Sequence, residues 1–130
     1  MQTLAAGLTG GVEKTVTDGD TAERWGSGLV PVLGTPTLVA MMENAAVKAL
    51  EGHLLASQTS VGGRMDVRHL APTPVGMAVR ARAELLEVDG RRLVFGIEAS
   101  DEVERIGEAT HERFIVGRDT FLAKAEAKGS

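Results

Sequence analysis

The chain has 130 residues, no cysteine and a formal net charge of −4 at pH 7. The length suits a single domain that spans residues 1–130, and the lack of cysteine excludes disulfides, thiolate metal sites and cysteine nucleophiles. The acidic balance argues against a broad nucleic-acid-binding surface, and no apolar run is long enough to cross a bilayer. We therefore expect a cytoplasmic protein with neither a nucleic-acid partner nor a membrane partner.

Small aliphatic side chains must build the core. Hydrophobic residues make up 43% of the chain, but it contains only three Phe, one Trp and no Tyr. Val, Leu, Ile, Met and Ala bury less area per residue than aromatic side chains do. Association between copies would supplement such a core, so we expect an oligomer.

The first expected element is a strand from Glu13 to Val16, followed by turn-forming residues at 17–21. The segment that continues to Gly34 combines Trp25 with several glycines and a proline. This composition is typical of a loop or lid.

One long helix is expected from Pro36 to about Gly52. Apolar residues share one face at spacings of three and four, namely Leu38, Met42, Ala45, Ala46 and Ala49. Thr35 can cap the first amides with its hydroxyl, and Pro36 suits the first turn. The many alanines permit close backbone approach, which predicts a helix wrapped by a curved sheet.

After the helix the hydrophobic period falls to two, as in strands. Residues 63–69 alternate apolar and charged positions, and His69 lies on the apolar side. Two further strands alternate over residues 77–85 and 93–99, with a tight turn at Asp89–Gly90 between them. A last strand is expected from about Arg105 to Val116, and the pattern leaves its buried face open.

Beyond Asp119 a polar tail predicts a short helix that frays. The order of elements is strand, loop, long helix and then four strands joined largely by tight turns. This order predicts an α+β fold with an antiparallel sheet and one buried helix.

Thr35 and Glu43 are the first candidate site residues. They stand eight positions apart, slightly more than two helical turns, so both can face one pocket. A carboxylate among alanines and methionines would be partly desolvated, which suits a general base or nucleophile. Glu43 could instead be a solvated flank residue, and capping alone would explain Thr35.

Three further candidates lie in the strands. His69 is either a proton-transfer group or a core residue. Gly62 either brings a backbone amide close to a ligand or marks a bulge, and Arg113 either binds an anionic group or decorates an outer face. The three histidines are dispersed, so we expect no metal site, and we expect no cofactor.

Taken together, three segments resemble the family of the fluoroacetyl-CoA thioesterase, a branch of the hotdog-fold thioesterases. Residues 34–50 resemble the family's helix, with Thr35 and Glu43 at the positions of active-site residues. Gly62, followed seven residues later by His69, resembles the strand with a pocket glycine and the catalytic histidine. Residues 107–113 resemble a later strand that ends on the family's active-site arginine, Arg113.

This resemblance implies a hotdog fold, in which an antiparallel sheet wraps one central helix, and hydrolysis of a short-chain acyl-CoA. It implies that Thr35, Glu43 and His69 are catalytic and that Gly62 and Arg113 contact the substrate. It also implies a homodimer with sheets joined edge to edge and active sites at the protomer interface. Residues 25–33 lack the phenylalanines of the family's namesake. We therefore expect no fluoroacetyl selectivity, and the acyl group stays open.

In the expected reaction Glu43 attacks the thioester carbonyl or activates water, Thr35 positions a reacting group, and His69 transfers protons. Two alternatives stay open. One is an acyl-CoA hydratase or dehydratase, because one fold supports several chemistries. The other is a non-catalytic acyl-CoA-binding module, in which Glu43 and His69 would be structural.

Overall fold

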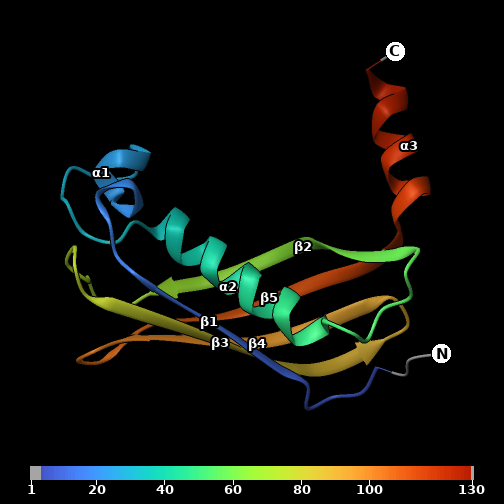
Figure 1. Cartoon of the computed structure of the whole chain (residues 1–130), viewed down its shortest axis with the longest axis horizontal. Coiled ribbons are helices and arrows are strands. Elements are labelled where there is room, and N and C mark those ends of the chain that lie inside the picture. Colours follow the sequence, from blue (N-terminus) through green and yellow to red (C-terminus); the bar gives the residue numbers. More distant parts are fainter. Residues whose placement is uncertain (1–3, 130) are drawn as a thin grey trace.

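The computed structural model describes residues 4–129 (Figure 1). In chain order its elements are β1 (Thr9–Thr15), the 3-10 helix η1 (Asp18–Asp20), α1 (Ala22–Trp25), α2 (Thr35–Leu50), β2 (Gln58–His69), β3 (Ala78–Asp89), β4 (Arg92–Asp101), β5 (Arg105–Gly117) and α3 (Arg118–Lys128). The strands form one sheet in the order β1-β3-β4-β5-β2, and every neighbouring pair is antiparallel. α2 lies across one face of this curled sheet (Figure 1). The expected α+β arrangement is confirmed.

The core lies between α2 and the inner face of the sheet. The sheet residues buried there alternate along their strands, and they are Val79, Ala81, Ala83 and Leu85 of β3 and Leu93, Phe95, Ile97 and Ala99 of β4. The helix residues buried against them are Leu38, Met41, Met42, Ala45, Ala46, Ala49 and Leu50. Apolar residues that repeat every two positions in the strands thus pack against apolar residues that repeat every three to four positions in the helix, as expected from the sequence.

α2 approaches β1 at backbone distance because both carry small residues where they cross. A Cβ added to Gly10 would lie 2.5 Å from the carbonyl oxygen of Ala45 and 2.8 Å from the Cα of Ala49. No side chain fits in that space, so glycine allows the helix to rest directly on the strand.

The start of α2 differs from the expectation. The helix begins at Thr35, Gly34 occupies the N-cap position, and no side chain caps the first amides. The predicted capping role of Thr35 is therefore wrong, because its hydroxyl bonds the His69 ring instead. At the other end Gly52 has a φ of +79°, the left-handed conformation in which helices often end.

Other element boundaries also differ from those expected from the sequence. β1 starts at Thr9, and η1 and α1 interrupt the segment that was expected to be irregular. The β3–β4 hairpin is confirmed, but Asp89 pairs with Arg92, so the turn lies at residues 90–91. Gly90 has a φ of +60°, which suits glycine at the first turn position. The expected C-terminal helix is present as α3, which extends to Lys128.

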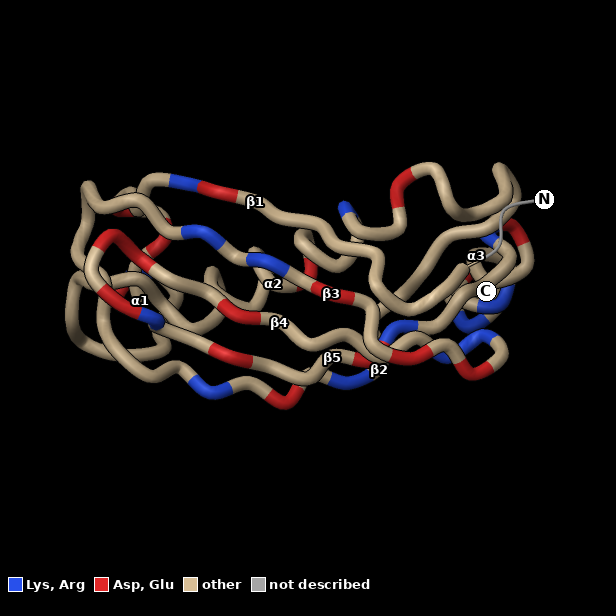
Figure 2. Tube along the Cα trace, turned by 90° about the horizontal axis from the view of Figure 1, so that it is seen from below, with Lys and Arg blue, Asp and Glu red and all other residues tan. Residues whose placement is uncertain are grey.

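The outer face of the sheet carries charges of both signs along its strands (Figure 2). Arg80 lies 2.9 Å from Glu13, and Arg105 lies 2.5 Å from Glu98. Such exposed pairs contribute little to stability, and this face presents no broad surface of one charge. Among residues 4–129, none of the helices has both the length and the apolar character needed to cross a lipid bilayer.

The contact between α2 and β1 can be tested by adding one methyl group. Gly10→Ala should lower the free energy of unfolding by about 2–3 kcal/mol, because the methyl meets helix backbone that cannot rotate away. Gly19→Ala is the control, since the nearest atom to its added Cβ lies 3.8 Å away. Urea unfolding measures both variants. Equal stabilities would contradict the described contact.

Candidate active site

Thr35 and His69 meet at the start of α2. Thr35 Oγ1 lies 2.8 Å from His69 Nδ1, although the two residues are 34 positions apart in the chain. His69 Nε2 is buried and has no hydrogen-bond partner among residues 4–129. Burial lowers the pKa of His69 from its ordinary value of 6.5, and the nearby backbone of Ala71 opposes this only in part. The ring is therefore a neutral imidazole at pH 7, bonded at one nitrogen and unpartnered at the other.

Glu43 occupies the middle of α2, where it faces β2 and β5. Its Oε2 lies 3.6 Å from Nη1 of Arg113, and the Glu43 side chain is 44% exposed. A Cβ added to Gly62 would lie 2.8 Å from the same Oε2, so glycine leaves the space that the carboxylate occupies. The register of β2 shifts between Gly62 and Arg64, so the strand is irregular at this point, as a bulge would make it.

Arg113 is buried on the inner face of β5, so its interpretation as an outer-face decoration is wrong. Its Nε donates to Ser60 Oγ at 2.9 Å, and its Nη2 donates to the Ser60 carbonyl at 3.0 Å. Burial lowers the pKa of Arg113, and the neighbouring Glu43 carboxylate opposes that shift. The guanidinium still carries its charge, because arginine is not deprotonated in proteins.

His111 and Ser60 belong to this site, and the sequence did not identify either of them. His111 is 1% exposed, with Nδ1 2.7 Å from the Arg64 carbonyl and Nε2 3.1 Å from Arg113 Nη1. A signal existed, because residues 111 and 113 of one strand point to the same face. This alternation did not identify the inner face of β5, because that face carries polar side chains and an apolar face is the usual criterion for burial.

The structure arranges these residues in two groups. One consists of Thr35 and His69, and the other of Glu43, Gly62 and Arg113. Thr35 and Glu43 are eight residues apart in α2, which is about 12 Å along the helix axis. Within residues 4–129 no hydrogen bond or ion pair joins the two groups.

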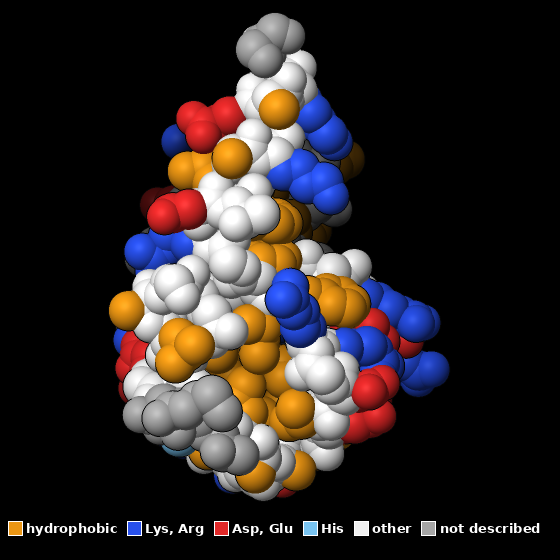
Figure 3. All heavy atoms as spheres, turned by 90° about the vertical axis from the view of Figure 1, so that its right-hand side faces the viewer, with side chains coloured by type: hydrophobic (Ala, Val, Ile, Leu, Met, Phe, Trp, Pro, Cys, Tyr) orange, Lys and Arg blue, Asp and Glu red, His pale blue; other side chains and the backbone are white. Residues whose placement is uncertain are grey.

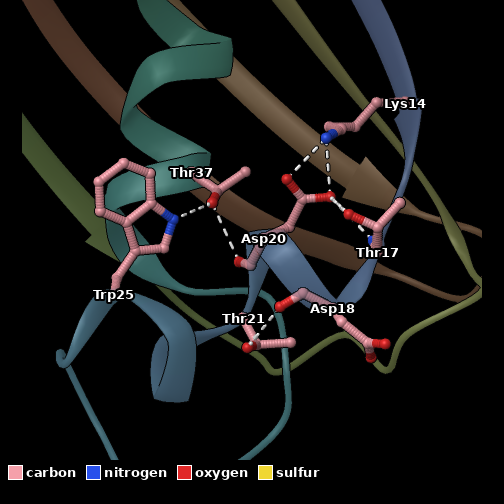
Figure 4. Close-up of polar contacts among 7 residues, drawn as sticks. All are labelled: Lys14, Thr17, Asp18, Asp20, Thr21, Trp25 and Thr37. Carbon is pink, nitrogen blue, oxygen red and sulfur yellow. Dashed lines mark hydrogen bonds and ion pairs between the residues drawn. The ribbon is translucent and has the colours of Figure 1, made fainter.

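Polar contacts tie the segment before α2 to the start of that helix (Figure 4). Thr37 Oγ1 donates to the Asp20 carbonyl at 3.0 Å and accepts from Trp25 Nε1 at 2.9 Å. The Asp20 carboxylate accepts two hydrogen bonds from Lys14 Nζ, at 2.6 and 2.7 Å, and two from Thr17. Burial alone would raise the pKa of Asp20, but the bonds from Lys14 and Thr17 outweigh it and hold that pKa below 3.8. These contacts anchor the first turn of α2, which carries Thr35.

No group of three or more His, Asp or Glu side chains within residues 4–129 is arranged to hold a metal ion. The side chains present are those of proton transfer and nucleophilic attack. They are a neutral imidazole with a hydroxyl, and a carboxylate with a guanidinium.

Comparison with known proteins identifies the family. A family model described as fluoroacetyl-CoA-specific thioesterase matches residues 16–119. A fluoroacetyl-CoA thioesterase from Streptantibioticus cattleyicolor is 40% identical over 97 residues, which cover 75% of this chain and 70% of that protein. The solved structure of the fluoroacetyl-CoA thioesterase FlK has a TM-score of 0.91 and 32% identity, and the match covers 98% of each chain.

The fold match extends further. A hot-dog-like protein from Thermanaerovibrio acidaminovorans has a TM-score of 0.88 and 25% identity, and the match covers 96% of this chain and 93% of that one. The expected hotdog fold is therefore confirmed. Because the family match spans most of the chain, this protein belongs to the fluoroacetyl-CoA-specific thioesterase family and is a thioester hydrolase.

Proposed function

We propose that this chain hydrolyses a short-chain acyl-CoA to the free acid and coenzyme A, with Thr35, Glu43 and His69 as its catalytic residues. The observation that carries the proposal is the Glu43 carboxylate, which lies against Gly62 and beside the buried Arg113 in a chain of the thioesterase family. The absence of cysteine favours the cytoplasm as its location. Residues 1–130 are proposed to act as one domain.

Glu43 supplies the reacting carboxylate. In one route its oxygen attacks the thioester carbon, a mixed anhydride forms, the CoA thiolate leaves, and water then hydrolyses the anhydride. In the other route Glu43 removes a proton from the water that attacks the carbonyl directly. Single turnover in oxygen-18 water separates the routes, because only the first places label in Glu43.

His69 and Thr35 handle the protons. The neutral ring accepts the proton that the hydrolysing water releases, directly or by way of Glu43, and delivers it to the CoA thiolate, while Thr35 holds the ring in place. The unpartnered Nε2 is the nitrogen available for this transfer. The proposed reaction requires a substrate thioester that contacts both groups of residues.

Gly62 and Arg113 are the proposed substrate-binding residues. Gly62 has no side chain that would displace the Glu43 carboxylate, since an added Cβ would lie 2.8 Å from Oε2. Three bonds to Ser60 and His111 hold the Arg113 guanidinium, which leaves Nη1 beside the Glu43 carboxylate. A thioester carbonyl placed there meets both a carboxylate and a positive charge, which favours the developing oxyanion.

We also propose a homodimer with active sites at the protomer interface. β2 pairs only with β5, so its other edge has no strand partner within residues 4–129. Apolar side chains gather below α3 on the end of the molecule (Figure 3), and Phe121 and Leu122 of α3 are 46% and 54% exposed. These features favour a second copy as partner. Sedimentation equilibrium distinguishes this dimer from a monomer.

A panel of short, branched and aromatic acyl-CoAs tests the reaction. Release of free thiol from at least one of them is expected. Loss of the double bond of an enoyl-CoA without thiol release would instead identify a hydratase. Tight binding of an acyl-CoA without turnover would identify a binding module.

Variants of Glu43 and His69 test the catalytic roles. Glu43→Gln keeps the shape and removes the charge, so turnover should collapse, and the melting temperature should fall because the buried Arg113 loses its compensating negative charge. His69→Ala should lower kcat by about a hundredfold or more, the usual effect of losing a positioned proton-transfer group. Thiol release and thermal melting are measured on each variant. A variant that loses melting temperature but hydrolyses at the parent rate would assign that residue to the fold.

The pH profile tests the state of His69. The ring must be neutral to accept a proton, and burial holds its pKa below the ordinary 6.5. Therefore kcat/KM should fall to half of its value at neutral or higher pH only below pH 6.5. A profile already half lost at pH 7 would show that the His69 pKa is raised, which would contradict its burial as described.

A further inference from the structure

His111 is a buried histidine whose two ring nitrogens both have partners on the inner face of the sheet. Nδ1 lies 2.7 Å from the Arg64 carbonyl oxygen of β2, and Nε2 lies 3.1 Å from Nη1 of Arg113 on its own strand. The ring also lies 6.4 Å, centre to centre, from the ring of Phe95 in β4. Neither the proposed reaction nor the core requires a polar side chain at this position.

The partners decide where the ring proton lies. A carbonyl oxygen can only accept a hydrogen bond, so Nδ1 must carry the proton, whereas a guanidinium can only donate, so Nε2 must offer its lone pair. Burial lowers the pKa of His111; the Arg64 carbonyl opposes this, Arg113 adds to it, and Glu43 opposes it. His111 is therefore a neutral acceptor toward Arg113.

The neutral state of His111 is important because the same Arg113 guanidinium also lies beside the Glu43 carboxylate. Arg113 Nη1, the nitrogen that donates to His111, is also 3.6 Å from Glu43 Oε2. A carboxylate at position 111 would orient Arg113 but would also neutralise its charge. An imidazole holds the same nitrogen and leaves the positive charge to act on Glu43.

We propose that His111 is a positioning residue that holds the Arg113 guanidinium against Glu43 and so fixes the carboxylate that attacks the thioester or its water. The inference rests on the proposed thioesterase reaction at Glu43. His111 acts through Arg113 and touches no reacting atom. Its loss therefore changes the rate of the chemical step more than it changes substrate affinity.

Two amide variants separate the two bonds of the ring. The amide group of glutamine reaches the position of Nε2, so His111→Gln keeps an acceptor for Arg113 and loses the bond to Arg64. The amide of asparagine reaches only the position of Nδ1, so His111→Asn keeps a donor to the Arg64 carbonyl and loses the bond to Arg113. Thr110→Ala, at an exposed position of the same strand, is the control.

Initial rates of thiol release give kcat and KM for all four proteins, and thermal melting shows which are folded. His111→Gln and Thr110→Ala should keep kcat within about threefold of the parent, whereas His111→Asn should lose about tenfold or more at nearly unchanged KM. An Asn variant at the parent rate would overturn the inference. Equal losses of kcat in the Gln and Asn variants would also overturn it, because they would indicate a structural role for the ring.

A second measurement needs no activity. Nitrogen-15 shifts of the parent protein at pH 7 should show His111 protonated at Nδ1 and unprotonated at Nε2. If the parent releases no thiol from any acyl-CoA, the proposed function fails, and these shifts still decide whether His111 accepts from Arg113. A ring protonated at Nε2 would overturn the inference whether or not the enzyme is active.

Discussion

The site depends on how closely α2 can approach the sheet. Gly10 has no side chain that would separate β1 from the helix. On the helix, Ala45 and Ala49 carry only a methyl group at the crossing point. Helix and strand therefore touch through their backbones, a contact with very little freedom to slide. Both Thr35 and Glu43 project from this helix, so its placement determines where both functional groups stand relative to β2 and β5.

The second requirement is the burial of one positive charge. Removing a guanidinium from water costs several kcal/mol unless hydrogen bonds and an opposite charge compensate. Here Ser60 and His111 accept from Arg113, and Glu43 supplies the negative charge at the border of the core. The absence of a side chain at Gly62 completes this arrangement, because a Cβ there would displace the Glu43 carboxylate. The segment before α2 is anchored through Asp20 and Thr37, and it contains no phenylalanine.

Much of the fold could be predicted because the spacing of hydrophobic residues is a local property of the sequence. The alternation in β3 and β4 and the helical spacing in α2 each correctly identified the buried face. The pattern left the buried face of β5 open, because His111 and Arg113 make its inner face resemble an outer one. The predicted capping role of Thr35 was wrong, because a hydroxyl at the start of a helix can either cap the first amides or bond a ring that is distant in the sequence.

The sequence by itself determined the element types, the family resemblance and the chemical inventory of carboxylate, imidazole, hydroxyl and guanidinium without thiol. Only the tertiary structure decided which of these groups meet. The contact of Thr35 with His69 and that of Arg113 with Ser60 each join residues more than thirty positions apart. Such contacts follow from strand register and from the height of the helix above the sheet. Both are collective results of packing, so no local pattern of residues encodes them.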